Sequence, residues 1–400
     1  MSNFRHNYPS LFMQALRRTI LPHHATVIVH IFQQIAQMLC QKSGKPDSTF
    51  WHGTCYYTHH SQQAQPITLG HFYMSAFENF GRDMERLMRA YEHVDLSPMG
   101  AAAVATTGFP ISRERVAELL GFHGMLVNSM DATSTLDYAY EPACAMAIFI
   151  NNVGRVTESL LLWNLNEVGI SRLALPYCSY STIMPQKRNP VALETLRYSG
   201  EWTYGTLSSM FNTMKAYPPG NGREPGLVVG QFFEIMQRIT DSAFLLEGII
   251  RNLEVDVPRA LEVVRNGFST VTDLADEMVR SMGLSFSAAK KIVGRLVVIA
   301  HDEGIACTQI DTALVARAAK EVLDIDLNMP QELITNALDP VQNVTRRHII
   351  GGPSPERVQE TIDNGQAQVE QLKVWRLAEE SRLQSVEDTL VSMAEDVVRA

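Results

Sequence analysis

The chain has 400 residues, of which 46% are hydrophobic and 19% charged, a composition typical of a globular protein with a substantial core. Its net charge of −9 argues against binding of nucleic acid or an anionic membrane through a basic surface, but it permits a local cationic pocket. The five cysteines are scattered and form no C-x-x-C pair. We therefore expect no disulfide framework, no metal site and a reducing, cytoplasmic location.

Helical periodicity dominates the first 255 residues. The predicted helices cover 11–41, with a break near Pro22, then 66–93, 113–120, 129–166, 190–215 and 226–253. An irregular stretch at 42–65 separates the first two, and strand patterns are almost absent. Asn151, Arg155 and Glu158 interrupt the most apolar segment, which indicates a buried helix and not a membrane span.

Helices become shorter after Pro258, and turn residues recur between them. We predict an all-α fold with a long central helical bundle and a smaller C-terminal helical domain. The expected divisions are a bundle at 1–255, the smaller domain at 256–363 and a charged helical tail at 364–400.

The loop 177–190 concentrates polar chemistry immediately before a helical pattern. Asn189 is predicted as the N-cap and Pro190 as the first helical residue, which places Ser181 and Lys187 near a helix N-terminus. Free backbone N–H groups and the helix dipole favour an anion there, such as a substrate carboxylate. An ordinary capped surface loop is the alternative. Ser179 and Cys178 are rival nucleophiles in the same stretch.

Several strings carry a family resemblance. Residues 181–190 read STIMPQKRNP and residues 60–68 read HSQQAQPIT. They are similar to G-S-S-x-M-P-Q-K-x-N-P and H-x-Q-x-A-Q-P-I-T of the fumarase/aspartase superfamily, most closely its argininosuccinate lyase branch. Segments at 97–101, 109–122, 128–132, 194–197, 338–340 and 346–357 follow the branch in order.

The resemblance implies a homotetramer in which three subunits contribute to each active site. It implies β-elimination of a dicarboxylate substrate to fumarate, with no metal or organic cofactor. Ser181 would be the base, and His60, held by Glu194, would act on the leaving group; His59 is the competitor of His60. The implied substrate-binding residues are Lys187, Asn189, Thr182, Met184, Gln65, His59, Arg5 and Arg223.

Three features depart from the family pattern. An N-terminal domain of roughly a hundred residues is expected to be largely missing, and Arg5 stands where that domain would supply a carboxylate contact. The segment Y-N-R-D-x-Q-x-D-K, which grips the arginine end of argininosuccinate in the family, is replaced by 220–225 (GNGREP). Tyr180 replaces the glycine before the proposed base, so we expect it to stiffen the loop or fill space.

The favoured interpretation is a lyase that releases fumarate, or a similar acid, from an N-substituted aspartate with a changed amine partner. Two alternatives remain. One is a true argininosuccinate lyase of arginine biosynthesis with a rebuilt pocket. The other is a non-catalytic oligomeric scaffold derived from such an enzyme.

Overall fold

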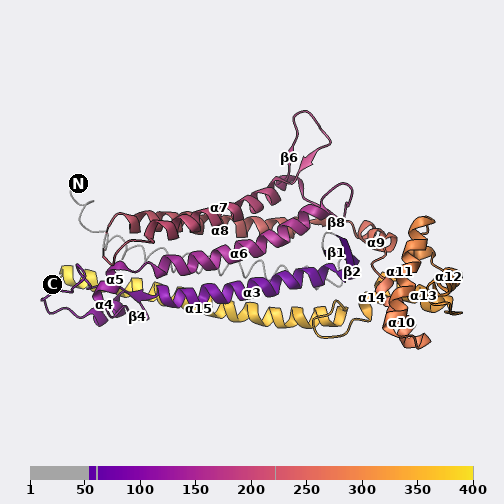
Figure 1. Cartoon of the computed structure of the whole chain (residues 1–400). Coiled ribbons are helices and arrows are strands. Elements are labelled where there is room, and N and C mark those ends of the chain that lie inside the picture. The colour runs from indigo at the N-terminus through magenta and orange to yellow at the C-terminus, as the bar shows by residue number, and fades with distance from the viewer. Residues whose placement is uncertain (1–53, 60–61, 221, 400) are drawn as a thin grey trace.

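The computed structural model describes residues 54–59, 62–220 and 222–399. It confirms the predicted all-α fold with a long central bundle and smaller helices at one end (Figure 1). The predicted helix at 11–41 lies outside the described residues. The bundle consists of α3 (Leu69–Val94), α6 (Asp137–Trp163), α7 (Val191–Met214), α8 (Glu224–Asn252) and α15 (Pro355–Arg399).

Burial of α6 holds the bundle together. This helix contacts α3, α7 and α8, which explains why it is apolar on most faces. Phe149 of α6 meets Phe80 of α3 with ring centroids 5.4 Å apart, and Trp163 meets Phe72 at 4.7 Å. Burying each such side chain stabilises the fold by about 1.5–3 kcal/mol. Within the described ranges, no helix has the length and apolar character needed to cross a bilayer.

A second, separate hydrophobic cluster lies among the smaller helices and consists of buried residues between Leu274 and Leu338, of which Leu274, Leu296 and Val315 are fully buried. These helices are α9 (Val257–Asn266), α10 (Val271–Met282), α11 (Phe286–Asp302), α12 (Thr312–Leu323), α13 (Gln331–Leu338) and α14 (Pro340–Thr345). The stretch 364–400 is predicted to be helical, and its helix, α15, already begins at Pro355. This helix returns along α3 to the far end of the bundle (Figure 1).

The prediction of an irregular stretch at 42–65 is wrong for its last part. Strand β1 (Thr54–His59) pairs antiparallel with β2 (Gln62–Thr68). Pro66 is tolerated because a two-stranded hairpin leaves one edge of each strand without a partner. The following helix consequently begins at Leu69, where Thr68 caps it by accepting from the N–H of His71 at 3.0 Å.

Three further two-stranded pairs join loops at the ends of the helices. They are β3 (Leu96–Ser97) with β4 (Gly124–Met125), β5 (Ser171–Arg172) with β8 (Glu254–Val255), and β6 (Ser179–Tyr180) with β7 (Arg188–Asn189). Only the first of these is parallel. Each pair fixes the position of a loop that helical packing alone would leave undetermined.

The prediction of one helix over 129–166 is also wrong at its start. Helix α5 (Ser129–Ser134) is separate from α6, because the backbone of Thr135 is extended. Asn128 caps α5 by accepting from the N–H groups of Met130 and Asp131. The short helix α4 (Arg113–Leu119) begins as predicted.

The loop between β3 and α4 has an unusual backbone. Gly100, Ala102, Val104 and Thr106 all have positive φ, between 49° and 74°. Such values are strained for residues with a Cβ atom, and most of all for a β-branched one. Side-chain hydrogen bonds tie the loop to its surroundings: Arg113 donates to the carbonyl of Met99 at 2.9 Å, and Ser129 Oγ donates to the carbonyl of Val104 at 2.7 Å. Arg113 also donates to the carbonyls of Leu126 and Val127, which links the loop to the segment after β4.

Replacing Val104 by glycine should stabilise the protein. Glycine relieves the backbone strain at φ 66°. The free energy gained exceeds the cost of the extra conformational entropy that glycine gives the unfolded chain. We expect a net gain of about 1 kcal/mol, seen as a rise of about 1–2 °C in apparent Tm by scanning calorimetry. Val127→Gly is the control, because Val127 is exposed and lies outside the residues of positive φ. A Val104→Gly protein that melts lower than the parent would contradict the strain argument.

Candidate active site

The polar loop predicted to carry the chemistry is the tip of a hairpin. Ser179 pairs with Asn189 and Tyr180 with Arg188, so residues 181–187 form the loop between β6 and β7. The hairpin projects from the bundle where α7 begins (Figure 1). Its tip is internally bonded, since Lys187 N–H donates to the carbonyl of Met184 at 3.0 Å.

Ser181 is half-buried at the base of this tip. Its Oγ accepts from the N–H of Met184 at 3.0 Å and from the N–H of Ile183 at 3.3 Å. Two backbone donors on one hydroxyl oxygen stabilise negative charge there. The rival Ser179 lies in β6, and its Oγ accepts from Asn189 Nδ2 at 3.4 Å.

The capping prediction for Asn189 is wrong. Pro190 occupies the N-cap position of α7 and Val191 is the first helical residue, with no side-chain capping bond. Asn189 cannot cap because it belongs to β7, where its side chain reaches across the ladder to Ser179. Glu194 in the first turn of α7 still lies where a carboxylate is stabilised by the helix dipole.

A cavity of about 800 Å³ lies beside the hairpin, between the C-terminal end of α6 and the start of α7. That volume suits a small-molecule ligand. The predicted site residues that line it are Met184, Lys187, Asn189 and Glu194. Ser181 and Thr182 are not among the lining residues.

Tyr180, which replaces the glycine of the family pattern, pairs with Arg188 across the hairpin. It lies in strand β6, outside the residues of positive φ, so its position needs no glycine. Its side chain is 56% exposed and does not line the cavity. Cys178 does line the cavity, but burial raises the pKa of its thiol, with Arg188 opposing that rise, so the thiol stays neutral near pH 7.

Two other predicted site residues, Gln65 and Arg223, are not among the residues that line the cavity. Gln65 is exposed in β2, and its side chain donates to Thr272 at 3.3 Å. Arg223 precedes α8, at the opposite end of α7 from the hairpin, and α7 spans about 36 Å. His59 ends β1, whereas His60 and Arg5 lie outside the described residues. One subunit therefore does not bring the described members of the set together.

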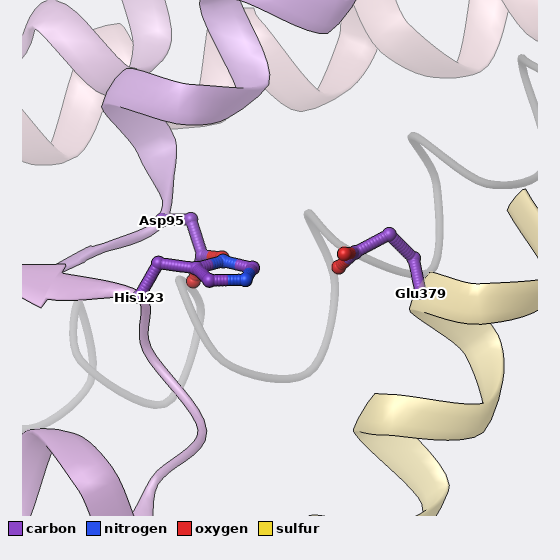
Figure 2. Close-up of side chains that lie close together, drawn as sticks. All are labelled: Asp95, His123 and Glu379. Carbon is purple, nitrogen blue, oxygen red and sulfur yellow. The ribbon is translucent and has the colours of Figure 1, made fainter. Parts of the chain in front are cut away.

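Sequence reasoning missed a second cluster of polar side chains, formed by Asp95, His123 and Glu379 (Figure 2). These types can bind metals, but the Arg382 guanidinium already bridges the carboxylates. Its Nη2 lies 3.0 Å from Asp95 and 2.6 Å from Glu379, and His123 bonds Asp95. Burial raises the pKa of Asp95, and the bonds from His123 and Arg382 oppose that rise. No local sequence signal marks this cluster, since Asp95 and Glu379 are far apart in the chain.

Comparison with known proteins gives the family of the chain. Residues 14–201 match the family described as Lyase, and residues 268–345 match the argininosuccinate lyase C-terminal family. The argininosuccinate lyase of Methanococcus maripaludis is 33% identical over 378 residues, covering 94% of this chain and 75% of that protein. The chain belongs to the argininosuccinate lyase family. The resemblance to the fumarase/aspartase superfamily noted from the sequence motifs is thereby confirmed.

Other relatives agree. The argininosuccinate lyase of Methanothermobacter thermautotrophicus is 37% identical over 311 residues, covering 78% of this chain and 66% of that protein. The argininosuccinate lyase of Methanosphaera stadtmanae is 36% identical, and the match covers 76% of this chain and 65% of that protein. The chain therefore spans about two thirds of the length of these two relatives. A crystal structure of EDDS lyase in complex with formate has a TM-score of 0.90 and 28% identity, and the match covers 97% of this chain and 76% of that one. Class II fumarase from Schistosoma mansoni, at 15% identity and TM-score 0.68, shares the fold.

Removing the cation from the Asp95 cluster should destabilise the protein. Arg382→Ala leaves two mostly buried carboxylates without their bridge, because Asp95 is 5% and Glu379 12% exposed. We expect a loss of about 2–3 kcal/mol, seen as a lower apparent Tm near pH 7. Arg399→Ala is the control, since Arg399 is 72% exposed and its pair with Glu395 contributes little. Equal Tm values for the two variants would show that the bridge is unimportant.

Proposed function

We propose that this protein is a carbon–nitrogen lyase that eliminates an amine from an N-substituted aspartate and releases fumarate. The observation that carries the proposal is the hairpin tip. Two backbone N–H groups donate to Ser181 Oγ, and the N–H of Ser181 donates to the carbonyl of Lys187, which lines the cavity together with Asn189. The named relatives support it, as does a variant of EDDS lyase with bound fumarate, which is 28% identical to this chain.

The chemistry follows from the charges. Ser181 first loses its hydroxyl proton to solvent, and the two backbone N–H groups and Lys187 stabilise the alkoxide. The alkoxide then takes a proton from the carbon beside a substrate carboxylate, and the resulting charge spreads onto that carboxylate. Lys187 and the Asn189 amide stabilise the doubly charged intermediate, which is the main source of acceleration in such a site. The C–N bond on the next carbon then breaks, and the amine leaves with a proton from His60, which Glu194 orients. Thr182 and Met184 complete the loop side of the substrate pocket. No metal or organic cofactor takes part.

The site is completed by assembly. We propose a cytoplasmic homotetramer with shared active sites, because Arg223 lies the length of α7 away from the hairpin of its own chain. Arg223, Gln65, His59 and Arg5 would then reach the cavity from neighbouring copies. Exposed apolar side chains on α7 and α8 supply a surface for such copies, among them Tyr198, Leu227 and Phe244. We also propose the domain division at 256–363, which is supported over its central part by the second hydrophobic cluster, between Leu274 and Leu338.

Activity is tested by mixing the protein with argininosuccinate, adenylosuccinate and simpler N-substituted aspartates and following fumarate absorbance. Fumarate from at least one compound is expected. Ser181→Ala should lower kcat about 10²–10⁴-fold, since proton abstraction loses its base. Ser159→Ala is the control, because among the described residues this half-buried hydroxyl donates only to the carbonyl of Arg155 in its own helix. A well-folded tetramer that yields no fumarate from any compound would favour the scaffold interpretation, and an active Ser181→Ala protein would remove Ser181 from the base role.

Assembly is tested with a charge on the exposed face of α8. Phe244→Glu should dissociate the tetramer into smaller species in analytical ultracentrifugation and reduce fumarate release, because a desolvated carboxylate is costly in an interface. Val298→Glu, on α11, is the matched control: the two parent side chains are 47% and 46% exposed. A Phe244→Glu protein that remains a tetramer would place the interface elsewhere.

A further inference from the structure

The cavity beside the hairpin is lined by more charge than the proposed reaction uses. Its lining includes four basic residues, Arg172, Lys187, Arg188 and Arg197, and three acidic ones, Glu158, Glu167 and Glu194. Arg197 lies 3.5 Å from Glu158, so these two neutralise each other. Three cations (Arg172, Lys187 and Arg188) and two carboxylates (Glu167 and Glu194) remain, so the net charge of the cavity lining is positive.

Strand pairing fixes the backbones of Arg172 and Arg188, while both side chains are exposed. Arg172 lies in β5, which pairs with β8, and Arg188 lies in β7, which pairs with β6. Among the described residues, neither side chain has a hydrogen bond or ion pair, and Arg172 makes none even with its cross-strand neighbour Glu254. Two other arginines show what an engaged guanidinium looks like in this protein: Arg113 donates to three carbonyls, and Arg347 donates to Asp273 at 2.9 Å.

Two unpaired guanidinium groups on one cavity favour a carboxylate ligand. A guanidinium presents parallel N–H donors that match a carboxylate in a bidentate arrangement. The aspartate part of the substrate already has Lys187, Asn189 and the backbone of the hairpin tip, so Arg172 and Arg188 are available to a different part. A cationic group placed there would instead be repelled.

We propose that Arg172 and Arg188 form an anion subsite that binds a carboxylate on the amine half of the substrate. The inference rests on the proposed function and deepens it: the preferred substrates are N-substituted aspartates whose amine part carries its own carboxylate. An uncharged amine part, or one ending in a cation at this position, binds less well. Neither residue touches the reacting bond, so the subsite sets specificity and not the chemical step.

The test uses three synthetic probes that differ only in the end of the amine part. They are N-(2-carboxyethyl)aspartate, N-propylaspartate and N-(3-guanidinopropyl)aspartate. Affinity is measured by titration calorimetry on the Ser181→Ala protein, so the readout does not depend on turnover. The carboxyethyl probe should bind about ten- to a hundredfold more tightly than the propyl probe.

Substitutions then assign the preference to residues. Arg172→Met and Arg188→Met, each added to Ser181→Ala, should weaken the carboxyethyl probe about tenfold or more and leave the propyl probe within about twofold. Arg188→Lys should restore part of the affinity, which separates loss of charge from damage to the hairpin. Arg265→Met is the control, because Arg265 is exposed on α9 and outside the cavity.

Two results would overturn the subsite. One is equal affinity of the Ser181→Ala protein, without a further substitution, for the carboxyethyl and propyl probes. The other is an equal loss of both probes in Arg172→Met and Arg188→Met, which would show a general effect on the cavity. Absence of fumarate release by the wild-type protein contradicts the proposed function alone, since the binding preference is measured independently.

Discussion

The structure depends on the burial of α6 by its neighbours. A helix that is apolar on most faces must be covered on most faces, and α3, α7 and α8 provide that cover. Once these helices lie side by side, the segment that joins α6 to α7 must cross the end of the bundle. The cavity opens at that crossing, and the hairpin β6–β7 stands over it. The position of the proposed chemistry is thus a consequence of packing that occurs far from any catalytic side chain.

Much of this arrangement follows from periodicity, and some of it does not. The long helices are predictable because apolar residues recur at helical spacing over 20 or more residues, as in α8. The hairpin β1–β2 is missed because its residues do not alternate regularly and include Pro66. The break before α6 is missed because it is short: only the extended residue Thr135 and the N-cap Leu136 separate α5 from α6. Local backbone geometry decides these points, and it leaves little trace in composition.

In the candidate site too, some features follow from the sequence motif and others depend on the fold. Lys187, Asn189 and Glu194 line one cavity, but Asn189 does not cap α7, because it lies in β7 and its side chain donates to Ser179. Arg172 could not be found from the motif, since it precedes the loop and reaches the cavity only through the β5–β8 pair. The bridge of Asp95 and Glu379 by Arg382 joins residues nearly 300 positions apart, which only the return of α15 along α3 brings together.

The geometry of a single chain also constrains how the proposed enzyme must work. The hairpin and Arg223 lie at opposite ends of α7, and a side chain cannot span about 36 Å. If both serve one substrate, antiparallel packing of neighbouring copies must bring one end of a bundle to the other end of the next. Under the proposed function, the cations at the cavity bind an anionic substrate, and the bound anion offsets the repulsion between neighbouring positive charges. The charge of the substrate therefore matters for the proposed site as much as the shape of the cavity does.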